Sequence, residues 1–329
     1  MSEDFKVICL GDPHFKVNNV PESEEMSNKF VELCQKENPK IIVVLGDILH
    51  RHETIHVTPL MKAEQLIKRL SEISPTFVIV GNHDRPNNSN YLTDEHPFNA
   101  MKHWDNTYVV DKVVDLKVGT FRFIFSPYVP PGKFMDALNT VDNPLENTNA
   151  IFAHQEFFGA KMGAIISQAG DKWSLDNPLV VSGHIHDYQQ LQDNMIYVGT
   201  PFQHAFGDSS DKTVSIFRFT QSSFKHERVD LGIKKRVIVY ITPDKIHDYI
   251  PPEDKLVKLI VKGEESEIKA CAKLEKIQEL KRMGVKISFK ATRTENTKTN
   301  NVQNVSYKDR LYQEIKTDLN CVKWFNKLF

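Results

Sequence analysis

Short apolar runs alternate with helix-period segments through the first part of the chain. The apolar runs occupy residues 7–10, 41–45 and 77–80. Their length and apolar content predict buried strands. Between them, apolar positions recur on one helical face within residues 26–34 and 60–70, and Pro39 and Pro75 end these two helices. The order predicts a βαβαβ opening, which is typical of α/β domains with a parallel sheet.

Extended runs rich in β-branched and aromatic residues follow Asp105. They cover residues 108–118, 121–128, 150–153, 179–182, 195–198 and 213–219. Such runs predict strands, and we expect them to form a second sheet. Residues 159–178 are richer in Gly, Ala and Asn than in core residues. That composition predicts a loop, with room for a short helix, in a position to overlie a site.

A separate small unit is predicted toward the C-terminus. Residues 256–261 and 285–289 have strand character, and residues 264–283 form one amphipathic helical pattern that ends at Gly284. The unit has the strand-helix-strand order of a small α/β domain. We therefore expect a large domain and a cap domain, at residues 1–230 and 231–290.

The C-terminal residues predict a tether and a helix. Residues 291–305 are polar with only two valines, which predicts a flexible linker. Residues 306–329 have an amphipathic helical pattern, and Ser306 with Asp309 resembles a capping box at its start. The apolar stripe of this helix is expected either to bind a partner or to pack on its own domain.

The composition is that of an ordinary globular protein, with 40% hydrophobic and 26% charged residues and a formal net charge of −1. That total hides an asymmetry. Residues 1–230 carry 21 Lys and Arg against 30 Asp and Glu, whereas residues 231–329 carry 21 against 13. A basic C-terminal part can meet phosphate backbones by counterion release, although a merely solvated lysine-rich surface is the alternative.

Several classes of protein are disfavoured. No apolar run reaches the roughly 18 residues that a membrane helix needs, and the N-terminus lacks a signal-peptide pattern. We therefore expect an intracellular, cytoplasmic protein without a membrane partner. The four cysteines contain no CxxC pair, which argues against a disulfide scaffold or a thiolate zinc site.

Four of the predicted strands end in the same kind of side chains. The segments are Gly11-Asp12-Pro13-His14, Gly46-Asp47, Gly81-Asn82-His83-Asp84 and Gly183-His184-Ile185-His186, and His154 follows a fifth strand. A glycine precedes each of the four polar groups, which permits a tight turn that projects ligands into a crevice. We expect these side chains to form one cluster.

The donor chemistry of this cluster predicts a metal centre. Carboxylate oxygen with imidazole nitrogen suits manganese, iron or zinc better than calcium. A dinuclear site needs about seven donors including one bridge, and two ions about 3.5–4 Å apart clamp a phosphoryl oxygen and acidify a bound water. Each motif alone is more often a turn or a core histidine pair, but their joint order after strands favours a metal site and phosphoester hydrolysis.

The ordered motifs resemble those of the calcineurin-like metallophosphoesterase family, over about residues 5–230. The resemblance implies an α/β fold with four layers, α/β/β/α, and two divalent ions. Manganese is the expected metal, with magnesium, iron and zinc as alternatives. The family pattern implies that one ion is held by Asp12, His14, Asp47 and His186. It implies that the other is held by Asp47, Asn82, His154 and His184, with Asp47 as the bridge.

The same pattern implies roles for two residues beside the ligands. His83 resembles the residue that stabilises the transition state or protonates the leaving oxygen. Asp84 resembles the partner that orients the imidazole of His83.

The second motif indicates which branch of the family the chain resembles. Gly46-Asp47-Ile48-Leu49-His50 departs from the Gly-Asp-x-Val-Asp-Arg-Gly of the protein phosphatases and is similar to the motif of SbcD-type recombination nucleases. That resemblance implies that His50 positions DNA for exonuclease cleavage, with a surface turn histidine as the alternative. It also implies a homodimer, a DNA-binding cap and a coiled-coil ABC-type ATPase partner. The short chain resembles phage-encoded or viral members.

We therefore expect a DNA exonuclease and endonuclease of a recombination or repair complex. A metal-bound hydroxide would attack the phosphodiester in line, and His83 would assist departure of the 3′ oxygen. A rival enzyme is a stand-alone phosphomonoesterase or small-substrate phosphodiesterase that uses the same metals. A rival from another class is a non-catalytic adaptor, which the complete donor set disfavours.

Overall fold

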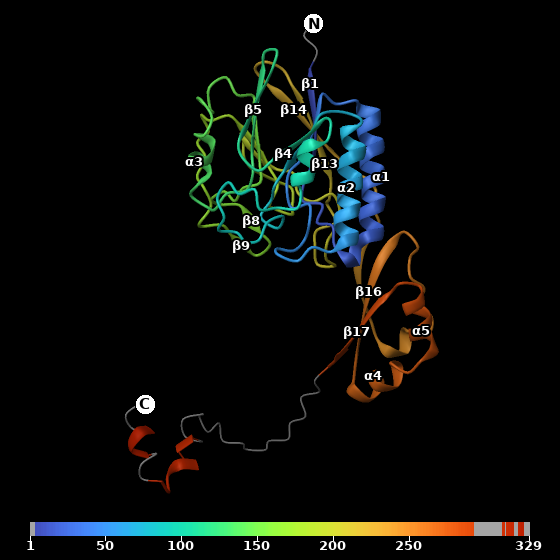
Figure 1. Ribbon diagram of the computed structural model, residues 1–329. Coiled ribbons are helices and arrows are strands. Elements are labelled where there is room, and N and C mark those ends of the chain that lie inside the picture. Colours follow the sequence, from blue (N-terminus) through green and yellow to red (C-terminus); the bar gives the residue numbers. More distant parts are fainter. Residues whose placement is uncertain (1–3, 293–310, 313, 319–321, 326–329) are drawn as a thin grey trace.

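The computed structural model describes residues 4–292, 311–312, 314–318 and 322–325 (Figure 1). Its first sheet has six strands in the order β14-β13-β1-β2-β3-β4. The bounds are β1 Phe5–Leu10, β2 Ile41–Val44, β3 Thr76–Ile79, β4 Thr107–Val110, β13 Val214–Phe219 and β14 Phe224–Val229. Strands β1 to β4 are parallel, whereas β13 runs antiparallel to β1 and β14 runs antiparallel to β13.

The second sheet also has six strands, in the order β11-β12-β10-β7-β6-β5. The bounds are β5 Val114–Val118, β6 Phe121–Ser126, β7 Ala150–Ala153, β10 Leu179–Ser182, β11 Gln189–Gln192 and β12 Met195–Tyr197. The four central strands are parallel and the two edge strands are antiparallel. Parallel strands bring their carboxyl ends to one edge, so both sheets can contribute side chains to one crevice.

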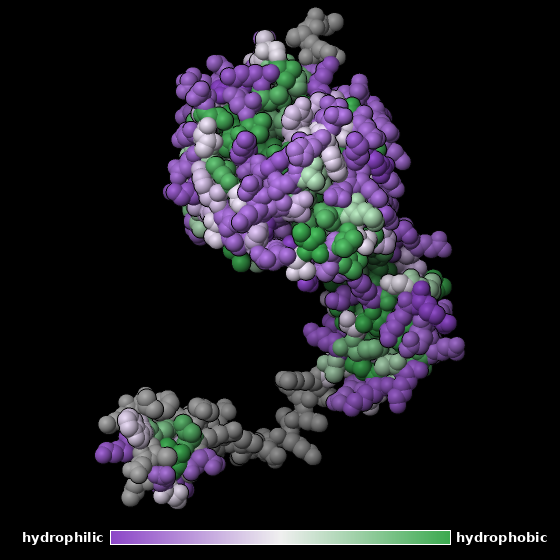
Figure 2. Space-filling model, viewed as in Figure 1, coloured by the Kyte–Doolittle hydropathy of each residue, from purple (hydrophilic) through white to green (hydrophobic). Residues whose placement is uncertain are grey.

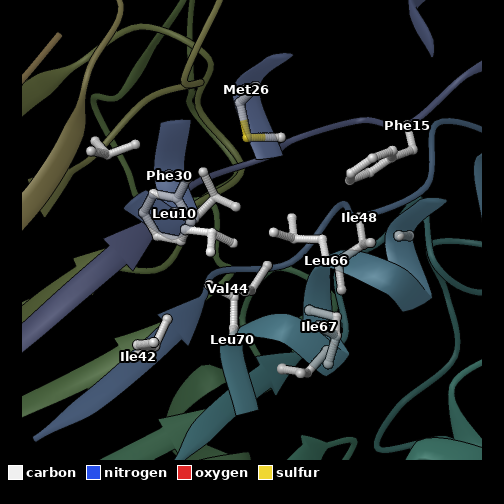
Figure 3. Packing of buried hydrophobic residues seen from close by; sticks show 14 of the residues in the cluster. Leu10, Phe15, Met26, Phe30, Ile42, Val44, Ile48, Leu66, Ile67 and Leu70 are labelled. Atoms are coloured by element: carbon white, nitrogen blue, oxygen red, sulfur yellow. The ribbon is translucent and has the colours of Figure 1, made fainter. Parts of the chain in front are cut away.

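Two helices cover the outer face of the first sheet, α1 (Val20–Glu37) and α2 (Val57–Ser71), and the short 3-10 helix η1 (Val17–Asn19) precedes α1. The strand residues alternate between two cores. Ile8 and Leu10 face the helices and belong to the core that includes Met26 and Phe30. Figure 3 shows Leu10 among these side chains. Val7 and Cys9 face the second sheet and join a core rich in phenylalanine. Because both faces of this sheet are buried, its strands are continuous apolar runs and do not alternate with polar residues.

The fourth layer lies on the outer face of the second sheet and is thin. A third buried cluster covers that face, and it includes Phe134 and Leu138 of the short helix α3 (Phe134–Leu138) together with Trp173. Another 3-10 helix, η2 (Asn99–His103), precedes β4. The expected α/β/β/α sandwich is therefore confirmed, although loops form most of its last layer.

The expected βαβαβ opening is present, but two runs assigned to the second sheet belong elsewhere. The run predicted over residues 108–118 is split, because β4 pairs with β3 and β5 pairs with β6. Between them the chain crosses from one sheet to the other at Asp111, whose carboxylate contacts His96 and Lys102. The run at residues 213–219 pairs with β1 of the first sheet. Local pattern identifies a strand but does not determine its partner.

The loop expected over residues 159–178 holds a small hairpin and no helix. Its strands are β8 (Lys161–Met162) and β9 (Ile165–Ile166). Gly163 adopts a φ of 64°, which the two-residue turn requires and which glycine adopts without steric cost. Lys161 and Met162 line a cavity together with His184 and His186, so the segment does border the candidate site.

The cap is built on a parallel three-stranded sheet, in the order β15-β16-β17, that lies beyond α1 and α2 in Figure 1. Its elements are β15 (Lys235–Ile241), η3 (Pro243–Lys245), β16 (Lys255–Gly263), α4 (Glu265–Cys271), α5 (Glu275–Arg282) and β17 (Lys286–Ala291). Strand β15 was not recognised in the sequence. The cap has a core of its own, which includes Leu259, Ile277 and Leu280.

The single helix predicted over residues 264–283 is wrong, because the chain breaks between α4 and α5. Leu274 is extended, with a φ of −63° and a ψ of 139°, and caps the start of α5. The apolar stripe of a continuous helix would drift around its axis over this length. The break lets Cys271, Ile277 and Leu280 all lie buried against the sheet.

The predicted terminal helix is also not continuous. The chain is helical at residues 311–312 and 314–315, turns at residues 316–317, and is helical again at residues 322–325. One straight helix would separate Tyr312 from Phe325 by about 20 Å. Their ring centroids are 5.4 Å apart, so the chain folds back on itself. Most of the predicted linker, residues 293–305, lies outside the described residues, and Ala291 belongs to β17.

Within the described part of the chain, no helix combines the length and the apolar character that crossing a bilayer requires. Hydrophilic side chains cover much of the visible surface of both the large domain and the cap (Figure 2).

Candidate metal centre

The carboxyl ends of β1, β2, β3, β7 and β10 bring all seven predicted metal ligands into one cluster. There are two groups of potential ligand atoms, and within each group all of the atoms lie within 4.8 Å of one another. One group consists of Asp12, His14 and Asp47, and the other of Asp47, His154 and His184. Asp47 belongs to both groups, as a bridging ligand between two ions would. The cluster is therefore compatible with the predicted dinuclear arrangement.

One half of the cluster gathers around the amide oxygen of Asn82. Its Oδ1 lies 2.9 Å from His154 Nε2 and 3.0 Å from His184 Nδ1. His154 Nε2 is in turn 3.3 Å from Asp47 Oδ1. His154 Nδ1 donates to the carbonyl of Leu45 at 2.7 Å, and this bond points Nε2 at the other donors. A backbone partner on the second nitrogen is the usual way in which proteins orient a metal-binding histidine.

The other half gathers around His14. Its Nε2 lies 2.9 Å from His186 Nε2 and 3.6 Å from Asp47 Oδ2. Its Nδ1 faces the carbonyl of Leu49 at 3.3 Å, and this contact orients Nε2 of His14 toward the other donors. Asp12 completes this half, and its Oδ1 accepts the backbone N–H of His184 at 2.8 Å.

The donors fit a pair of divalent ions. Asp12 Oδ2 is buried and has no hydrogen-bond partner, which is rare for a carboxylate oxygen and is explained if a cation binds there. Oxygen and imidazole nitrogen donors suit manganese, iron and zinc. The three cysteines among the described residues are buried thiols and none of them belongs to either group of donors. Asp12, His14, Asp47 and His186 would hold one ion, and Asp47, Asn82, His154 and His184 the other.

The buried charges interact strongly. Burial raises the pKa of Asp12 to about 8, and repulsion by Asp47 adds to that shift. Burial by itself would also raise the pKa of Asp47, but His154 and His14 hold the pKa of that carboxyl well below its usual range. Burial alone would lower the pKa of His154, whereas the neighbouring Asp47 carboxylate raises it to about 9. Two carboxylates this close and this buried favour additional positive charge between them.

Backbone strain is concentrated at the ligands. Asp12, His14, Asp47 and His184 have φ values of 40°, 43°, 48° and 79°. This left-handed conformation costs an L-residue roughly 1–3 kcal/mol and persists only where the surroundings enforce it. Such strain is typical of functional sites, and here it turns successive side chains toward the same crevice.

The glycines before the ligands are required mainly for space. A Cβ at Gly81 would lie 2.4 Å from Asp47 Oδ1, and one at Gly183 would lie 2.4 Å from the carbonyl oxygen of Leu45. Of the four glycines that precede the motifs, only Gly46 has a positive φ, of 94°. The expectation that each glycine permits a tight turn is therefore corrected, because three of them permit close approach of neighbouring strands instead.

His83 lies at the edge of the cluster, where a substrate could reach it. Its backbone N–H donates to Asp47 Oδ1 at 2.9 Å, and its ring Nδ1 donates to the carbonyl of His50 at 2.9 Å. Ring Nε2 lies 4.0 Å from Asp47 Oδ2, and 31% of the side chain is exposed. The predicted role as an acid beside the metal centre is consistent with this position and stays a prediction.

Asp84 does not orient the imidazole of His83 as expected. Its carboxylate accepts the backbone N–H groups of Ile48, Leu49 and Gly81 at 3.2, 2.8 and 3.0 Å. The backbone carbonyl of His50 holds the ring of His83 instead. Asp84 is placed to secure the loop after β2, and it acts on His83 only through that loop.

His50 lies beside the cluster, as expected for a residue that contacts substrate. Its ring is 5.2 Å from that of His14 and stacks at 5.9 Å against that of His83. Burial, with a contribution from the charge of Lys16, lowers the pKa of His50 to about 4. The imidazole is therefore neutral near pH 7, and its Nδ1 is buried without a hydrogen-bond partner.

His204 is a member of the cluster that sequence reasoning missed. Its ring centroid lies 5.0 Å from that of His14 and 5.7 Å from that of His186, and its Nε2 donates to the carbonyl of Asp12 at 3.0 Å. Burial holds its pKa well below the usual range. A single histidine in a loop carries no spacing signal, so only the fold could reveal it.

Comparison with known proteins agrees with this geometry. Residues 5–188 match the family model described as calcineurin-like phosphoesterase. The chain is 41% identical over 281 residues to "Putative phosphoesterase 244L" of Invertebrate iridescent virus 6, covering 82% of this chain and 98% of that protein. It is 39% identical over 319 residues to "Putative phosphoesterase 078R" of Invertebrate iridescent virus 3, covering 94% and 92%.

Among solved structures, a dimetal phosphatase from Danio rerio aligns with 68% of this chain and 95% of its own, at 12% identity and a TM-score of 0.46. The family match covers more than half of the chain, and the viral relatives cover most of it. The chain therefore belongs to the calcineurin-like phosphoesterase family and is a metal-dependent phosphoesterase.

Proposed function

We propose that the chain is a DNA exonuclease and endonuclease, the nuclease subunit of a recombination or repair complex of the SbcD type. Manganese is the metal that we propose for its two ion positions. The observation that carries this proposal is the charge of the cap sheet, whose charged side chains on the face opposite α4 and α5 are all basic.

One face of the cap sheet packs against α4 and α5 through apolar residues such as Val239, Leu259 and Phe289. The strand register places the alternate residues on the other face. Its charged members are all basic: Lys258, Lys262, Lys286 and Lys290, together with Arg236, which is buried and pairs with Glu22 of α1. The five carboxylates between residues 255 and 291 all lie within the helical segment 264–279. We call the basic side the open face of the cap.

The open face also carries an aromatic residue and leads toward the metal centre. Tyr240 is 59% exposed, and Lys262 Nζ lies 4.1 Å from its ring centroid. At the end of the sheet nearest the catalytic domain, Arg236 and Lys286 lie 5.4 and 5.6 Å from the ring of Phe206. Phe206 is two residues from His204 of the cluster. Cations with interspersed aromatic rings are typical of surfaces that bind nucleic-acid strands.

The mechanism that we propose uses the residues of the cluster in fixed roles. When bound, the two ions supply Lewis-acid polarisation of the phosphodiester and a water of increased acidity. His83 donates Nδ1–H to the His50 carbonyl, so a proton held on Nε2 is the one available to the leaving 3′ oxygen. Asp84 keeps the loop that carries His50 in place through its three backbone contacts.

Manganese-dependent digestion of end-labelled duplex DNA, run beside hydrolysis of an aryl phosphate ester, tests this function. We expect DNA cleavage that falls at least about tenfold in the double variant Lys258→Glu/Lys290→Glu, because two phosphate contacts are lost. Lys273→Glu, an exposed position between α4 and α5, is the matched control and should behave as the unaltered protein does. Hydrolysis of the aryl ester without any cleavage of DNA would favour the stand-alone phosphoesterase.

We also propose a coiled-coil ABC-type ATPase subunit and a second copy of this chain as partners. Support for the first is the exposure of Tyr312 and Trp324, at 39% and 64%, in the C-terminal segment. Support for the second is the exposure of Val57 and Met61, at 81% and 42%, on α2. Sedimentation of the full chain tests the dimer. Deletion of residues 293–329 should abolish ATP-stimulated DNA processing while leaving hydrolysis of the aryl ester intact.

A further inference from the structure

A cavity of about 210 Å³ opens beside the metal centre on the side of His50. Its walls are residues 15–18 and residues 49–51 with Thr54, and the start of α2 closes it. The floor is apolar, formed by Phe15, Leu49 and Pro59, which are all largely buried. The cavity is smaller than the roughly 300–1,000 Å³ of pockets that enclose whole ligands, so it suits one unit of a larger substrate.

The polar lining of the cavity is basic. Lys16 and Arg51 contribute positive charge, His50 and His56 contribute imidazole rings, and no residue that lines the cavity carries a carboxylate. The helix α2 begins at Val57 with no acidic residue in its first turn and no side chain that caps it. Its N-terminal N–H groups and its dipole therefore add to the attraction for an anion.

The walls are held in place before any ligand binds. Phe15 and Leu49 form a β-bridge, and Phe15 N–H donates to the Ile48 carbonyl at 2.7 Å. The side chains of Phe15 and Ile48 lie near each other in Figure 3. Asp84 secures the backbone of Ile48 and Leu49 from the opposite side. His50 Nδ1, buried without a partner, is a polar atom of this preformed wall.

The cavity connects the metal centre to the open face of the cap. The ring of His50 lies next to those of His14 and His83 at one end. At the other end, Lys16 Nζ donates to the carbonyl of His204 at 3.4 Å, and Arg236 and Lys286 lie against the ring of Phe206, two residues further along the chain. A strand bound along the open face would pass this cavity before it reached the ions.

We propose that the cavity is a subsite for one nucleotide of the DNA strand, adjacent to the phosphodiester that is cleaved. Lys16, Arg51 and the N-terminus of α2 bind the phosphate of that nucleotide, and its base lies against the apolar floor. This subsite rests on the nuclease function proposed above.

The first test uses the manganese-loaded full chain and oligonucleotides that carry one abasic residue at successive positions around a defined cleavage point. The unaltered protein should lose about tenfold in kcat/KM when the abasic residue is at one position only. In Arg51→Glu and Lys16→Gln this positional effect should disappear. Lys225→Glu, an exposed change on β14, is the control and should keep the profile. A profile that Arg51→Glu leaves unchanged, or one without a sensitive position, overturns the subsite.

The second test separates failure of the subsite from failure of the nuclease function. Calorimetry of the full chain with a chelator present would compare deoxyadenosine monophosphate, inorganic phosphate and deoxyadenosine. We expect the nucleotide to bind most tightly and Arg51→Glu to weaken it about tenfold. Equal affinity for inorganic phosphate reduces the cavity to an anion site and overturns the proposal. Nucleotide binding in a protein that cleaves no DNA rejects the nuclease function but keeps nucleotide recognition by this cavity.

Discussion

The functional side chains of the metal centre and those of the cap are positioned by different structural features. In the metal centre most donors are fixed by backbone features: four have left-handed φ values, and the rings of His154 and His14 each face a backbone carbonyl. In the cap no individual residue is special, and the basic surface results from strand register, which sorts lysines from apolar residues. Single substitutions should therefore be severe at the metal centre and gradual on the cap.

Asp47→Ala should have the largest effect, because Asp47 contributes to both groups of donors. We expect both ions to be lost and turnover to fall by about 10³-fold or more, beyond the loss for a single hydrogen-bond donor. Metal analysis of the purified variant measures the first effect. Asp254→Ala, an exposed carboxylate of the cap, is the matched control. Retention of two ions would contradict the bridging role.

His83→Ala should separate metal binding from catalysis. The ring belongs to neither group of donors, and its Nε2 comes no closer than 4.0 Å to Asp47 Oδ2, so both ions should stay bound while kcat falls about 10²–10⁴-fold. Metal content and single-turnover rates measure the two effects independently. His247→Ala in the cap carries the same chemical change at an exposed position and should leave both unchanged. Loss of the ions from the His83 variant would mean that the residue is structural.

Leu259→Ala should unfold the cap without disturbing the metal centre. Leu259 is fully buried in the cap core, and truncation of such a side chain costs about 2–5 kcal/mol. We expect limited proteolysis to cleave the cap of this variant first, and DNA binding to weaken while hydrolysis of an aryl phosphate ester persists. Equal loss of both activities would show that the two regions are coupled.

A pair of glycine substitutions compares the two regions directly. Gly183→Ala places a Cβ against the Leu45 carbonyl beside the ligands, which should cost about 1–3 kcal/mol and displace Asp12 and His154. Gly284→Ala in the cap meets open space, and only its φ of 85° is unfavourable, at roughly 1–2 kcal/mol. Metal affinity should fall in the first variant alone. Chemical denaturation and metal titration of both variants measure this contrast.

The smallest effect concerns the ionic cluster of Asp111, His96 and Lys102, at the point where the chain crosses between the two large sheets. Burial would raise the pKa of Asp111, but hydrogen bonds from His96 and Lys102 lower it to about 2. Because the folded pKa is depressed, this carboxylate stabilises the fold at pH values above about 4. That contribution of about 1–2 kcal/mol is lost as the pH falls from 4 to 2. The stability difference between the unaltered protein and Asp111→Asn should therefore shrink over this range of pH in urea titrations.

Much of the metal centre could be predicted because the local sequence around its residues shows where they lie in the fold. A donor directly after an apolar run lies at a strand end, and strand ends of a parallel sheet converge, so Asp12, Asp47 and His184 could be grouped in advance. The role of Asp84 could not be predicted, since its three backbone partners lie in segments whose approach depends on packing. His204 was missed for the same reason.

The amino-acid order alone established the βαβαβ opening, the polar side chains that follow the strand ends and the excess of positive charge in the C-terminal third. These are properties of short segments, in which periodicity and neighbouring residue types are enough. Only the tertiary structure decided that β13 joins the first sheet, that the predicted cap helix is broken, and that Lys258, Lys262, Lys286 and Lys290 share one face of the cap sheet. Each of these depends on contacts between distant segments, whose free energies no local window of residues contains.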